Sequence, residues 1–279
     1  MKREKMENLF EILPYLKEFH DKSFVIKIGG NVLKNDDSKK SFAQSVVLLK
    51  HMGMNPIVVH GGGPEITHLM NQLGMKAAFH NGYRVTDEKT MEIVEMVLSK
   101  LNKDIASCIT AQGVKAIGLS GKDASLLIAK KDLSNGDIGY VGTIEKVNTQ
   151  LIQILVEKNY IPVIAPIGSG EDGKSYNINA DIAAAEIAKS ICAEKLILLT
   201  DVDGVFQDGK LISYLTVQSA QAIIDNKVVE GGMIPKIQCA IFALKGGVKS
   251  VHIINGNSPI SLLAEIFTLE GVGTMIKKE

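Results

Sequence analysis

Two patterns of hydrophobic and polar positions alternate along most of this chain. The first is a short, nearly continuous run of apolar residues, which predicts a buried strand. Such runs occupy residues 24–28, 56–60, 115–119, 161–167, 195–200 and 251–254. The second is an apolar position at every third or fourth residue, which predicts an amphipathic helix. This pattern occupies residues 38–52, 64–73, 87–112, 149–159, 180–191, 217–226 and 234–245.

The regular alternation of these two patterns predicts an α/β fold. Strands that alternate with helices form βαβ units, in which each helix returns the chain to start another parallel strand. The strands are apolar almost throughout rather than at every second residue, which fits a sheet covered on both faces. We therefore expect a mostly parallel central sheet with helices on either side.

Three segments depart from the alternation. Residues 126–147 contain GDIGYVGT and lack a helical period, so they predict a β-hairpin. Residues 168–174, GSGEDGK, predict an exposed turn, and a soft division of the chain falls near residue 170. Residues 6–19 predict an amphipathic helix that Pro14 would kink. The pattern does not decide whether this helix caps the core or contacts another subunit.

Composition narrows the class of protein. The chain has 279 residues, 46% of them hydrophobic, which is enough for one large domain or two lobes. The formal net charge is +0, so the basic surface typical of a nucleic-acid-binding protein is not expected. The three cysteines lie far apart and predict reduced thiols in a cytoplasmic protein. No apolar run reaches the length of a membrane span.

Two common nucleotide-binding motifs are disfavoured. The stretch AIGLSGKD approaches a Walker A loop, but Ala116 replaces the first glycine and Asp123 follows the lysine. The glycines in residues 168–173 have the G-x-G-x-x-G spacing after a strand. Two acidic residues inside that spacing would face the phosphates, however, and no helix follows directly.

Three other glycine clusters are better candidates for an anion site. Gly29 and Gly30 follow the first predicted strand, and residues 61–63 follow the second, where open α/β sheets bind ligands. The second cluster leads into Pro64, a favoured first residue of a helix, and helix N-termini bind anions. The third cluster, residues 231–232, precedes another predicted helix. Each cluster alone could be an ordinary tight turn.

Two lysines lie in unusual positions beside these clusters. Lys27 interrupts an apolar strand, where a buried ammonium group needs a partner. Lys236 falls in the first turn of a predicted helix, where a cation opposes the helix dipole. Both positions suggest a bound anion. An isolated Lys27 could instead belong to an edge strand and extend its amine into solvent.

Polar residues accompany a third helix start. Asn179 and Asp181 open an alanine-rich helix, where Asn179 is a good N-cap and Asp181 suits the helix dipole. This reading does not explain why Asn177 also precedes the helix. Arg84 lies in a loop before a helix, where it could hold a carboxylate bidentately or simply lie on the surface.

Two aspartates close the strand at residues 195–200. Asp201 and Asp203 precede Gly204, so they could form an ordinary turn. They could equally form the rim of a purine site or supply an acid linked to a metal. The residues alone leave these alternatives open.

Together these motifs resemble the amino-acid kinase family, and within it the branch that phosphorylates N-acetyl-L-glutamate. FVIKIGG, VVHGGGPEI, NGYRVTD, GLSGKD, YNINAD, LLTDVDGVF and GGMIPK occur in the order of that family, from about Lys22 onward. Kinases of carbamate, aspartate, glutamate and uridylate share the fold and the K-x-G-G start. They lack the combination of HGGGP, NG-x-RVT and GGM-x-x-K. One departure is Ala124 in GKDA, where glycine is expected.

The resemblance implies an open αβα sandwich and a reaction. Residues 22–170 would bind the acyl-amino acid and mediate dimerisation, and residues 171–279 would bind ATP. The reaction would transfer a phosphoryl group to the γ-carboxylate of N-acetyl-L-glutamate, giving N-acetyl-L-glutamyl 5-phosphate in arginine biosynthesis. A carboxylate with a reference pKa near ~4.3 is already ionised at neutral pH, so no general base is required. The reaction needs alignment and charge neutralisation.

The resemblance also implies roles for individual residues. Lys27 and Lys236 would flank the phosphoryl group, Gly30 and Gly62 would donate backbone N–H groups to it, and Asp181 would orient both lysines. N-acetyl-L-glutamate would be held by Gly62, Gly63, Arg84 and Asn177. The ATP site would be lined by Asp201, Val202, Asp203, Gly204, Val205, Phe206, Val228, Gly231, Gly232 and Met233. Mg²⁺ would be carried by the ATP phosphates, with no protein ligand assigned.

Other segments resemble the arginine-inhibited branch of these kinases. They are LPYLKEF near the N-terminus, HIINGN, and LLAEIFTLEGVGTMI. In that branch an N-terminal helix, here within residues 1–21, interlaces dimers into a hexamer. The implied arginine site is Tyr15, Lys195, His252, Glu265 and Gly271, with Glu265 as a partner for the guanidinium. Without the resemblance, His252 could be a buried strand histidine and Glu265 part of a solvated helix face.

Two other functions stay open. Another acyl-phosphate-forming kinase of this fold would accept glutamate or carbamate, and Arg84 and Asn177 argue against it. A non-catalytic arginine-sensing scaffold would have lost turnover, and the joint retention of Lys27, Lys236 and Asp181 argues against that.

Overall fold

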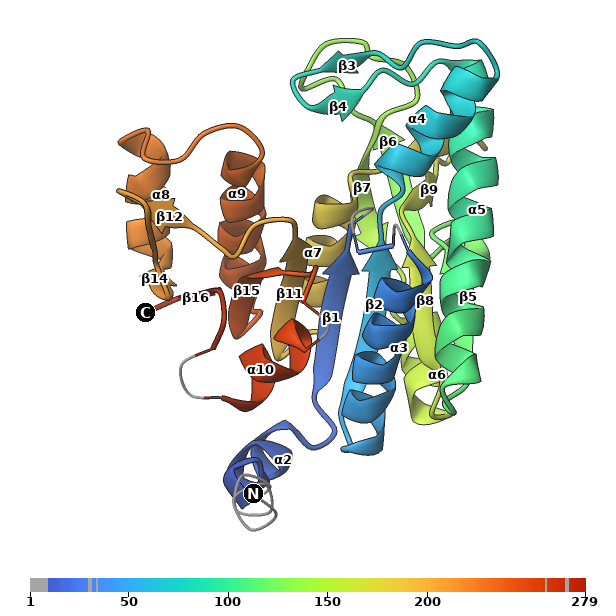
Figure 1. Cartoon of the computed structure of the whole chain (residues 1–279). Coiled ribbons are helices and arrows are strands. Elements are labelled where there is room, and N and C mark those ends of the chain that lie inside the picture. Colours follow the sequence, from blue (N-terminus) through green and yellow to red (C-terminus); the bar gives the residue numbers. More distant parts are fainter. Residues whose placement is uncertain (1–9, 30–31, 34, 259, 269–270) are drawn as a thin grey trace.

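The computed structural model describes residues 10–29, 32–33, 35–258, 260–268 and 271–279. The chain forms an eight-stranded sheet with helices on both faces (Figure 1), in the strand order β14-β16-β15-β11-β1-β2-β8-β5. The strands are β1 (Ser23–Ile28), β2 (Asn55–His60), β5 (Ala116–Ser120), β8 (Ile161–Ala165), β11 (Lys195–Thr200), β14 (Tyr214–Thr216), β15 (Ser250–Asn255) and β16 (Thr274–Lys277). Every neighbouring pair is parallel except β15 and β16.

Alternate residues of the central strand β1 face the two helical layers. Val25 packs into a core shared with α7 and α9, whereas Phe24 and Ile26 pack into a core shared with α3 and α5. All three side chains are 0% exposed, so β1 is buried on both faces, as its continuous apolar run predicts. The α/β class and the layered, mostly parallel architecture are therefore confirmed.

The helices follow the predicted segments closely, except for α10, which no prediction covers. They are α2 (Leu13–Phe19), α3 (Asp36–His51), α4 (Gly63–Gln72), α5 (Glu88–Ala111), α6 (Gln150–Glu157), α7 (Ala180–Ser190), α8 (Val217–Asp225), α9 (Met233–Lys245) and α10 (Ser261–Phe267). Only part of the predicted helix 6–19 lies among the described residues. There Pro14 occupies the first turn of α2, where its missing N–H breaks no helical hydrogen bond.

A smaller sheet and two short hairpins flank the main sheet. Strands β6 (Leu127–Lys131) and β7 (Gly142–Val147) form the predicted antiparallel hairpin. They join β9 (Ile167–Ser169) and β10 (Ser175–Asn177), whose connecting turn is the predicted GSGEDGK segment. The short hairpins are β3 (Phe79–His80) with β4 (Tyr83–Arg84), and β12 (Phe206–Gln207) with β13 (Lys210–Leu211).

One predicted strand is wrong in extent. The expected strand 161–167 is interrupted at Pro166, which has no N–H to continue a ladder, and the chain divides there into β8 and β9. Strand β1 pairs directly with β11, so residues on both sides of the soft division near 170 contribute to one sheet. Within the described ranges, no helix combines the length and the apolar character needed to cross a bilayer.

Candidate functional site

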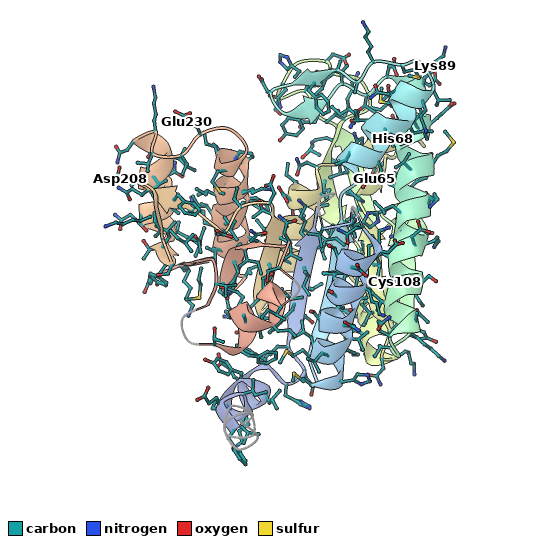
Figure 2. All side chains as sticks on the ribbon, in the orientation of Figure 1. Glu65, His68, Lys89, Cys108, Asp208 and Glu230 are labelled. Carbon is teal, nitrogen blue, oxygen red and sulfur yellow. The ribbon has the colours of Figure 1, made fainter. Side chains whose placement is uncertain are left out.

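Lys27, the charged residue that interrupts an apolar run, lies near the carboxyl end of β1. This strand lies between β11 and β2, and Lys27 is only 8% exposed, so the edge-strand interpretation is wrong. Figure 2 shows Glu65 and His68 of α4 on one side of this end of β1, and Glu230, which precedes α9, on the other. Residues from both halves of the chain therefore lie on either side of this edge of the sheet.

A single carboxylate joins the two predicted lysines. Asp181 lies 2.8 Å from the amine of Lys27 through Oδ1 and 2.8 Å from the amine of Lys236 through Oδ2. Burial alone would raise the pKa of Asp181, but the charges of both lysines outweigh it and lower the pKa to about 2. Asp181 is therefore ionised, and this trio carries an excess of one positive charge.

Local structure fixes the three side chains. Asn179 caps α7, accepting from the N–H of Asp181 at 2.9 Å, so the carboxylate is held in the first turn of that helix. Lys236 lies in the first turn of α9. The thiol of Cys239, one turn further along α9, donates to the carbonyl of Asp181 at 3.0 Å and ties the two helices together.

A cavity of about 170 Å³ opens directly beside this trio. Both lysines line it, together with residues such as Thr200 that the sequence did not single out. The full lining is Lys27, Gly29, Val32, Pro64, Leu199, Thr200, Asp201 and Lys236. Gly30, predicted to donate to a phosphoryl group, lies outside the described residues. Thr200 carried no local signal, because a threonine that ends a strand is unremarkable in sequence.

A second cavity, of about 190 Å³, contains the glycine turn after β2. It is lined by residues that include Gly62, Gly63, Arg84 and Asn177, so the structure brings together all four residues predicted to hold the acyl-amino acid. A Cβ at Gly62 would lie 2.6 Å from Cδ2 of Leu98 of α5, so a side chain there would require Leu98 to shift. Phe79 and Tyr83 of the β3–β4 hairpin also line this cavity.

Arg84 is buried in the wall of that cavity, at 6% exposure, so the surface-arginine interpretation is wrong. Its guanidinium donates to the carbonyl of Gly63 at 2.9 Å and to the hydroxyl of Thr67 at 2.8 Å, and lies 4.8 Å from the ring centre of Phe79. Burial lowers its pKa below the ordinary value. No carboxylate of the described chain forms an ion pair with it, which leaves a buried cation facing a ligand-sized space.

The segments predicted to hold a nucleotide are only partly exposed. Asp203 accepts a hydrogen bond from the amide of Asn255 at 2.8 Å. Val205 is fully buried, and its N–H donates to the Thr274 hydroxyl at 2.8 Å, so neither its backbone nor its side chain is exposed here. Gly232 is the N-cap residue of α9. Among the described residues, no group of three or more His, Cys, Asp or Glu is arranged to hold a metal.

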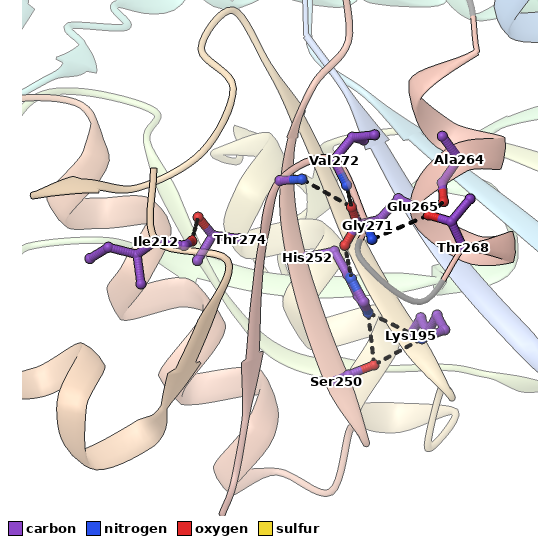
Figure 3. A network of polar contacts seen from close by, with 11 residues as sticks. Lys195, Ile212, Ser250, His252, Ala264, Glu265, Thr268, Gly271, Val272 and Thr274 are labelled. Atoms are coloured by element: carbon purple, nitrogen blue, oxygen red, sulfur yellow. Dashed lines mark hydrogen bonds and ion pairs between the residues drawn. The ribbon is translucent and has the colours of Figure 1, made fainter. Parts of the chain in front are cut away.

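A second polar cluster lies near the amino ends of β11 and β15 (Figure 3). His252 donates from Nδ1 to Glu265 at 2.6 Å, and its Nε2 lies 3.2 Å from the Lys195 amine and 3.0 Å from the Ser250 hydroxyl. Glu265 is only 7% exposed, so the interpretation of a solvated helix face is wrong. Ser250 gave no sequence signal.

The electrostatics of this cluster favour a neutral imidazole beside a carboxylate. Burial, reinforced by the Lys195 charge, lowers the pKa of His252 although Glu265 opposes the shift. Burial would raise the pKa of Glu265, but its contacts with His252 and with the N–H groups of Val272 and Gly273 lower it.

The remaining predicted residues of this cluster lie around it. Gly271 adopts φ +63°, and a Cβ there would lie 2.8 Å from Glu265, so glycine is favoured on both counts. Tyr15 stacks on Phe19 at 6.2 Å between ring centres, and the Lys195 amine lies 4.9 Å from the same Phe19 ring. The Tyr15 hydroxyl is buried and has no partner within the described part of the chain.

Known proteins resemble this chain over its whole length. The sequence model of the amino acid kinase family matches residues 22–255. The chain is 61% identical over 278 residues to the acetylglutamate kinase of Pseudothermotoga lettingae, and the alignment covers 100% of both chains. It is 63% identical over 278 residues to the acetylglutamate kinase of Kosmotoga olearia, with 99% of each chain covered.

A more distant relative has been solved with ligands. The N-acetylglutamate synthase of Neisseria gonorrhoeae, complexed with coenzyme A and N-acetyl-glutamate, superimposes with a TM-score of 0.89 at 29% identity, over 98% of this chain. The present chain spans 63% of the length of that synthase chain. A structure of the same synthase with coenzyme A and L-arginine superimposes with a TM-score of 0.84 at 29% identity, over 98% of this chain and 65% of that chain.

Proposed function

Because this chain belongs to the amino acid kinase family, we propose that it catalyses the ATP-dependent phosphorylation of the γ-carboxylate of N-acetyl-L-glutamate. The product would be N-acetyl-L-glutamyl 5-phosphate, an intermediate of arginine biosynthesis. The observation that carries this proposal is the pair of lysines that share Asp181 beside a cavity at the carboxyl end of β1. Two relatives with more than half of their residues identical are acetylglutamate kinases.

The glycine-lined cavity suits an acyl-amino acid with two carboxylates. Arg84 would pair with the α-carboxylate, because it is a buried guanidinium without an ion-pair partner among the described residues. Gly62 and Gly63 permit close backbone approach, and Asn177, which also lines this cavity, offers an amide. These contacts would hold the substrate with its γ-carboxylate directed toward Lys27 and Lys236.

The lysine trio suits a group that carries negative charge during transfer. Two ammonium groups share one carboxylate, so their excess positive charge fits a phosphoryl group between them. Asp181 would keep the lysines from repelling each other and fix their positions. No residue needs to remove a proton, because the attacking carboxylate is ionised at neutral pH.

The nucleotide side of the proposal rests on residues 201–206 and 228–233. The backbone at Gly231 and Gly232 permits close approach of a ligand, because both glycines have open space where a side chain would lie. When bound, ATP supplies the phosphoryl group and carries Mg²⁺ on its phosphates. The chain would contribute the surrounding backbone and the two lysines.

Three further elements belong to the proposal. Arginine would inhibit the enzyme by binding at Tyr15, Lys195, His252, Glu265 and Gly271. The subunits would form dimers that the N-terminal helix joins into hexamers, with residues 22–170 and 171–279 acting as the acyl-amino-acid and ATP lobes. The location would be cytoplasmic. The synthase solved with L-arginine supports the first element, as a relative of this fold.

One assay tests the function directly. ADP release is measured with N-acetyl-L-glutamate, with glutamate, with carbamate and with no acceptor, each with and without millimolar arginine. We expect turnover that depends on N-acetyl-L-glutamate and falls when arginine is added. Equal turnover with glutamate or carbamate would support another acyl-phosphate-forming kinase, and no turnover with any acceptor would contradict the proposal. Turnover that does not change when arginine is added would contradict only the proposed inhibition by arginine.

A further inference from the structure

His60 is a buried ionisable residue without a role in the proposed reaction. It is the last residue of β2 and 0% exposed, and it precedes the glycine turn directly. Its Nδ1 lies 2.9 Å from the carbonyl oxygen of Gly61. A carbonyl oxygen can only accept, so Nδ1 carries the hydrogen and donates it. Burial lowers the pKa of His60 to about 4, which keeps the ring neutral at physiological pH.

Asn102 of α5 fixes that tautomer from the other side. Its amide nitrogen lies 3.1 Å from Nε2 of His60 and donates its second hydrogen to the carbonyl of Val163 in β8, at 2.9 Å. Asn102 is 2% exposed, and its amide oxygen lies so close to Gly118 of β5 that a Cβ there would collide with it. A hydrogen-bonded chain therefore runs from the sheet through α5 to the glycine turn.

The geometry of the peptide bond between Gly61 and Gly62 fixes the direction of the Gly62 N–H. Described peptide bonds are all trans, so the carbonyl of Gly61 and the N–H of Gly62 point in opposite directions. Because His60 holds that carbonyl, the Gly62 N–H is directed away from the imidazole. A Cβ at Gly62 would lie 2.6 Å from Leu98 of α5, so this leucine side chain lies close beside the glycine turn. Within the described residues, no backbone carbonyl accepts a hydrogen bond from the Gly62 N–H.

We infer that His60, held by Asn102, is a positioning residue that aims the Gly62 N–H at the phosphoryl group during transfer. The inference rests on the proposed function, in which Gly62 donates to that group. A donor that is already oriented stabilises developing charge without reorganisation, whereas a peptide free to rotate must first be aligned. His60 itself lines neither of the two cavities.

Replacements at His60 separate positioning from packing. In His60→Asn, the amide nitrogen can occupy nearly the position of Nδ1 and keep the donor to Gly61. His60→Phe fills the space of the ring but removes the donor. We expect kcat to fall about 10- to 100-fold in His60→Phe and to stay within about 3-fold of wild type in His60→Asn, with KM for N-acetyl-L-glutamate nearly unchanged in both.

A stability control and a second variant complete the set. Ile105→Ala removes core packing one turn along α5 from Asn102, so it should lower the melting temperature without lowering kcat. Asn102→Leu should reduce kcat about 3- to 10-fold, because the ring loses its anchor but keeps its donor. Equal kcat in wild type and His60→Phe, or an equal loss in Ile105→Ala, would overturn the inference.

One measurement on the wild-type protein does not depend on activity. Nitrogen-15 NMR of the histidine side chains at neutral pH should show His60 as the neutral Nδ1–H tautomer, assigned by its absence from His60→Asn. An Nε2–H tautomer would overturn the inference whatever the enzyme catalyses. Failure of the wild type to turn over N-acetyl-L-glutamate would instead count against the proposed function.

Discussion

Two lysine clusters lie at opposite ends of the same strands, and their charges are balanced differently. Lys27 pairs in register with Leu198 near the carboxyl ends of β1 and β11, whereas Lys195 begins β11 beside Phe24. The first cluster sets two lysines against one carboxylate. The second sets one lysine and a neutral histidine against one carboxylate, which also accepts two backbone N–H groups.

This difference follows from where each cluster lies in the fold. Carboxyl ends of parallel strands meet helix N-termini, such as those of α4 and α7, and favour negatively charged ligands. A surplus of cations there is consistent with a bound phosphoryl group. The amino ends meet helix C-termini instead, such as those of α3 and α5, which do not favour anions, so the buried charges there satisfy one another. A ligand can act there only by replacing internal bonds, which suits regulation better than chemistry.

The largest expected effect comes from breaking the cluster at the carboxyl end. Lys27→Ala and Lys236→Ala should each lower kcat by roughly 10²- to 10³-fold, because each removes a cation from the transferring phosphoryl group. Lys130, whose pair with Glu145 is exposed, supplies the control Lys130→Ala, which should keep normal kcat. Steady-state ADP release and thermal unfolding check both points. Unfolding of the Lys27 and Lys236 variants, rather than slow turnover, would favour a purely structural role.

The next effect concerns the cluster at the amino end. Glu265→Gln keeps an acceptor for the backbone N–H groups but removes the charge proposed to bind the guanidinium of arginine. The half-inhibitory concentration of arginine should rise at least about 10-fold, equivalent to about 1.4 kcal/mol, while kcat without arginine stays normal. Glu145→Gln, on an exposed strand residue, is the matched control. Unchanged sensitivity to arginine in Glu265→Gln would place the inhibitor elsewhere.

The two clusters also show how much the sequence could predict. Lys27 and Lys236 could be predicted because each is unusual where it lies. Lys27 is a charged residue in an apolar strand, and Lys236 is a cation at a helix N-terminus. Their sharing of Asp181 is a long-range contact that no local pattern contains. Ser250 and His60 fit their strands without contradiction, so nothing marked them until the structure placed their partners. Gly30 stays a prediction, because it lies outside the described residues.

For the fold, too, only features with a local sequence pattern could be predicted. Long periodic segments such as α5 and continuous apolar strands such as β11 were predicted within about two residues. The seven-residue helix α10 was missed, since it is too short to establish a helical period. The hairpin β3–β4 was read as a loop, because two-residue strands carry no alternation.

A third prediction uses pH to distinguish the clusters. His252 has a lowered pKa in the folded protein, so below the ordinary value of about 6.5 the unfolded chain binds a proton that the folded chain does not. Its stabilising contribution is therefore complete above that pH and declines below it. Asp181, with its pKa lowered from 3.8 to about 2, loses its contribution only at much lower pH.

Replacement of the imidazole should remove that decline. Between about pH 7.5 and pH 5.5, the unfolding free energy of the wild type should fall by about 1 kcal/mol more than that of His252→Asn, measured by denaturant unfolding at constant salt. His60, whose pKa in the fold is about 4, also binds a proton in this window in the unfolded chain, but it is present in both proteins, so its contribution cancels. Parallel pH profiles would show that His252 is not held neutral in the fold.

The smallest effect is expected at the same edge of the sheet as the lysine trio, but away from it. Ala124, which stands where the family resemblance led us to expect glycine, adopts φ +49° after β5, and the amide of Asn148 holds its carbonyl at 3.1 Å. Left-handed backbone costs a non-glycine residue roughly 1 kcal/mol, which about offsets the extra chain entropy of glycine in the unfolded state. Ala124→Gly should therefore change the unfolding free energy by less than about 0.5 kcal/mol and leave kcat unchanged.

The control is Ala222→Gly, in the exposed face of α8. Its unfolding free energy should fall by about 1 kcal/mol, because no backbone strain is relieved there. Equal losses in the two variants would mean that the Ala124 turn carries no strain, and a lower kcat in Ala124→Gly would extend the catalytic edge beyond the lysine trio to β5.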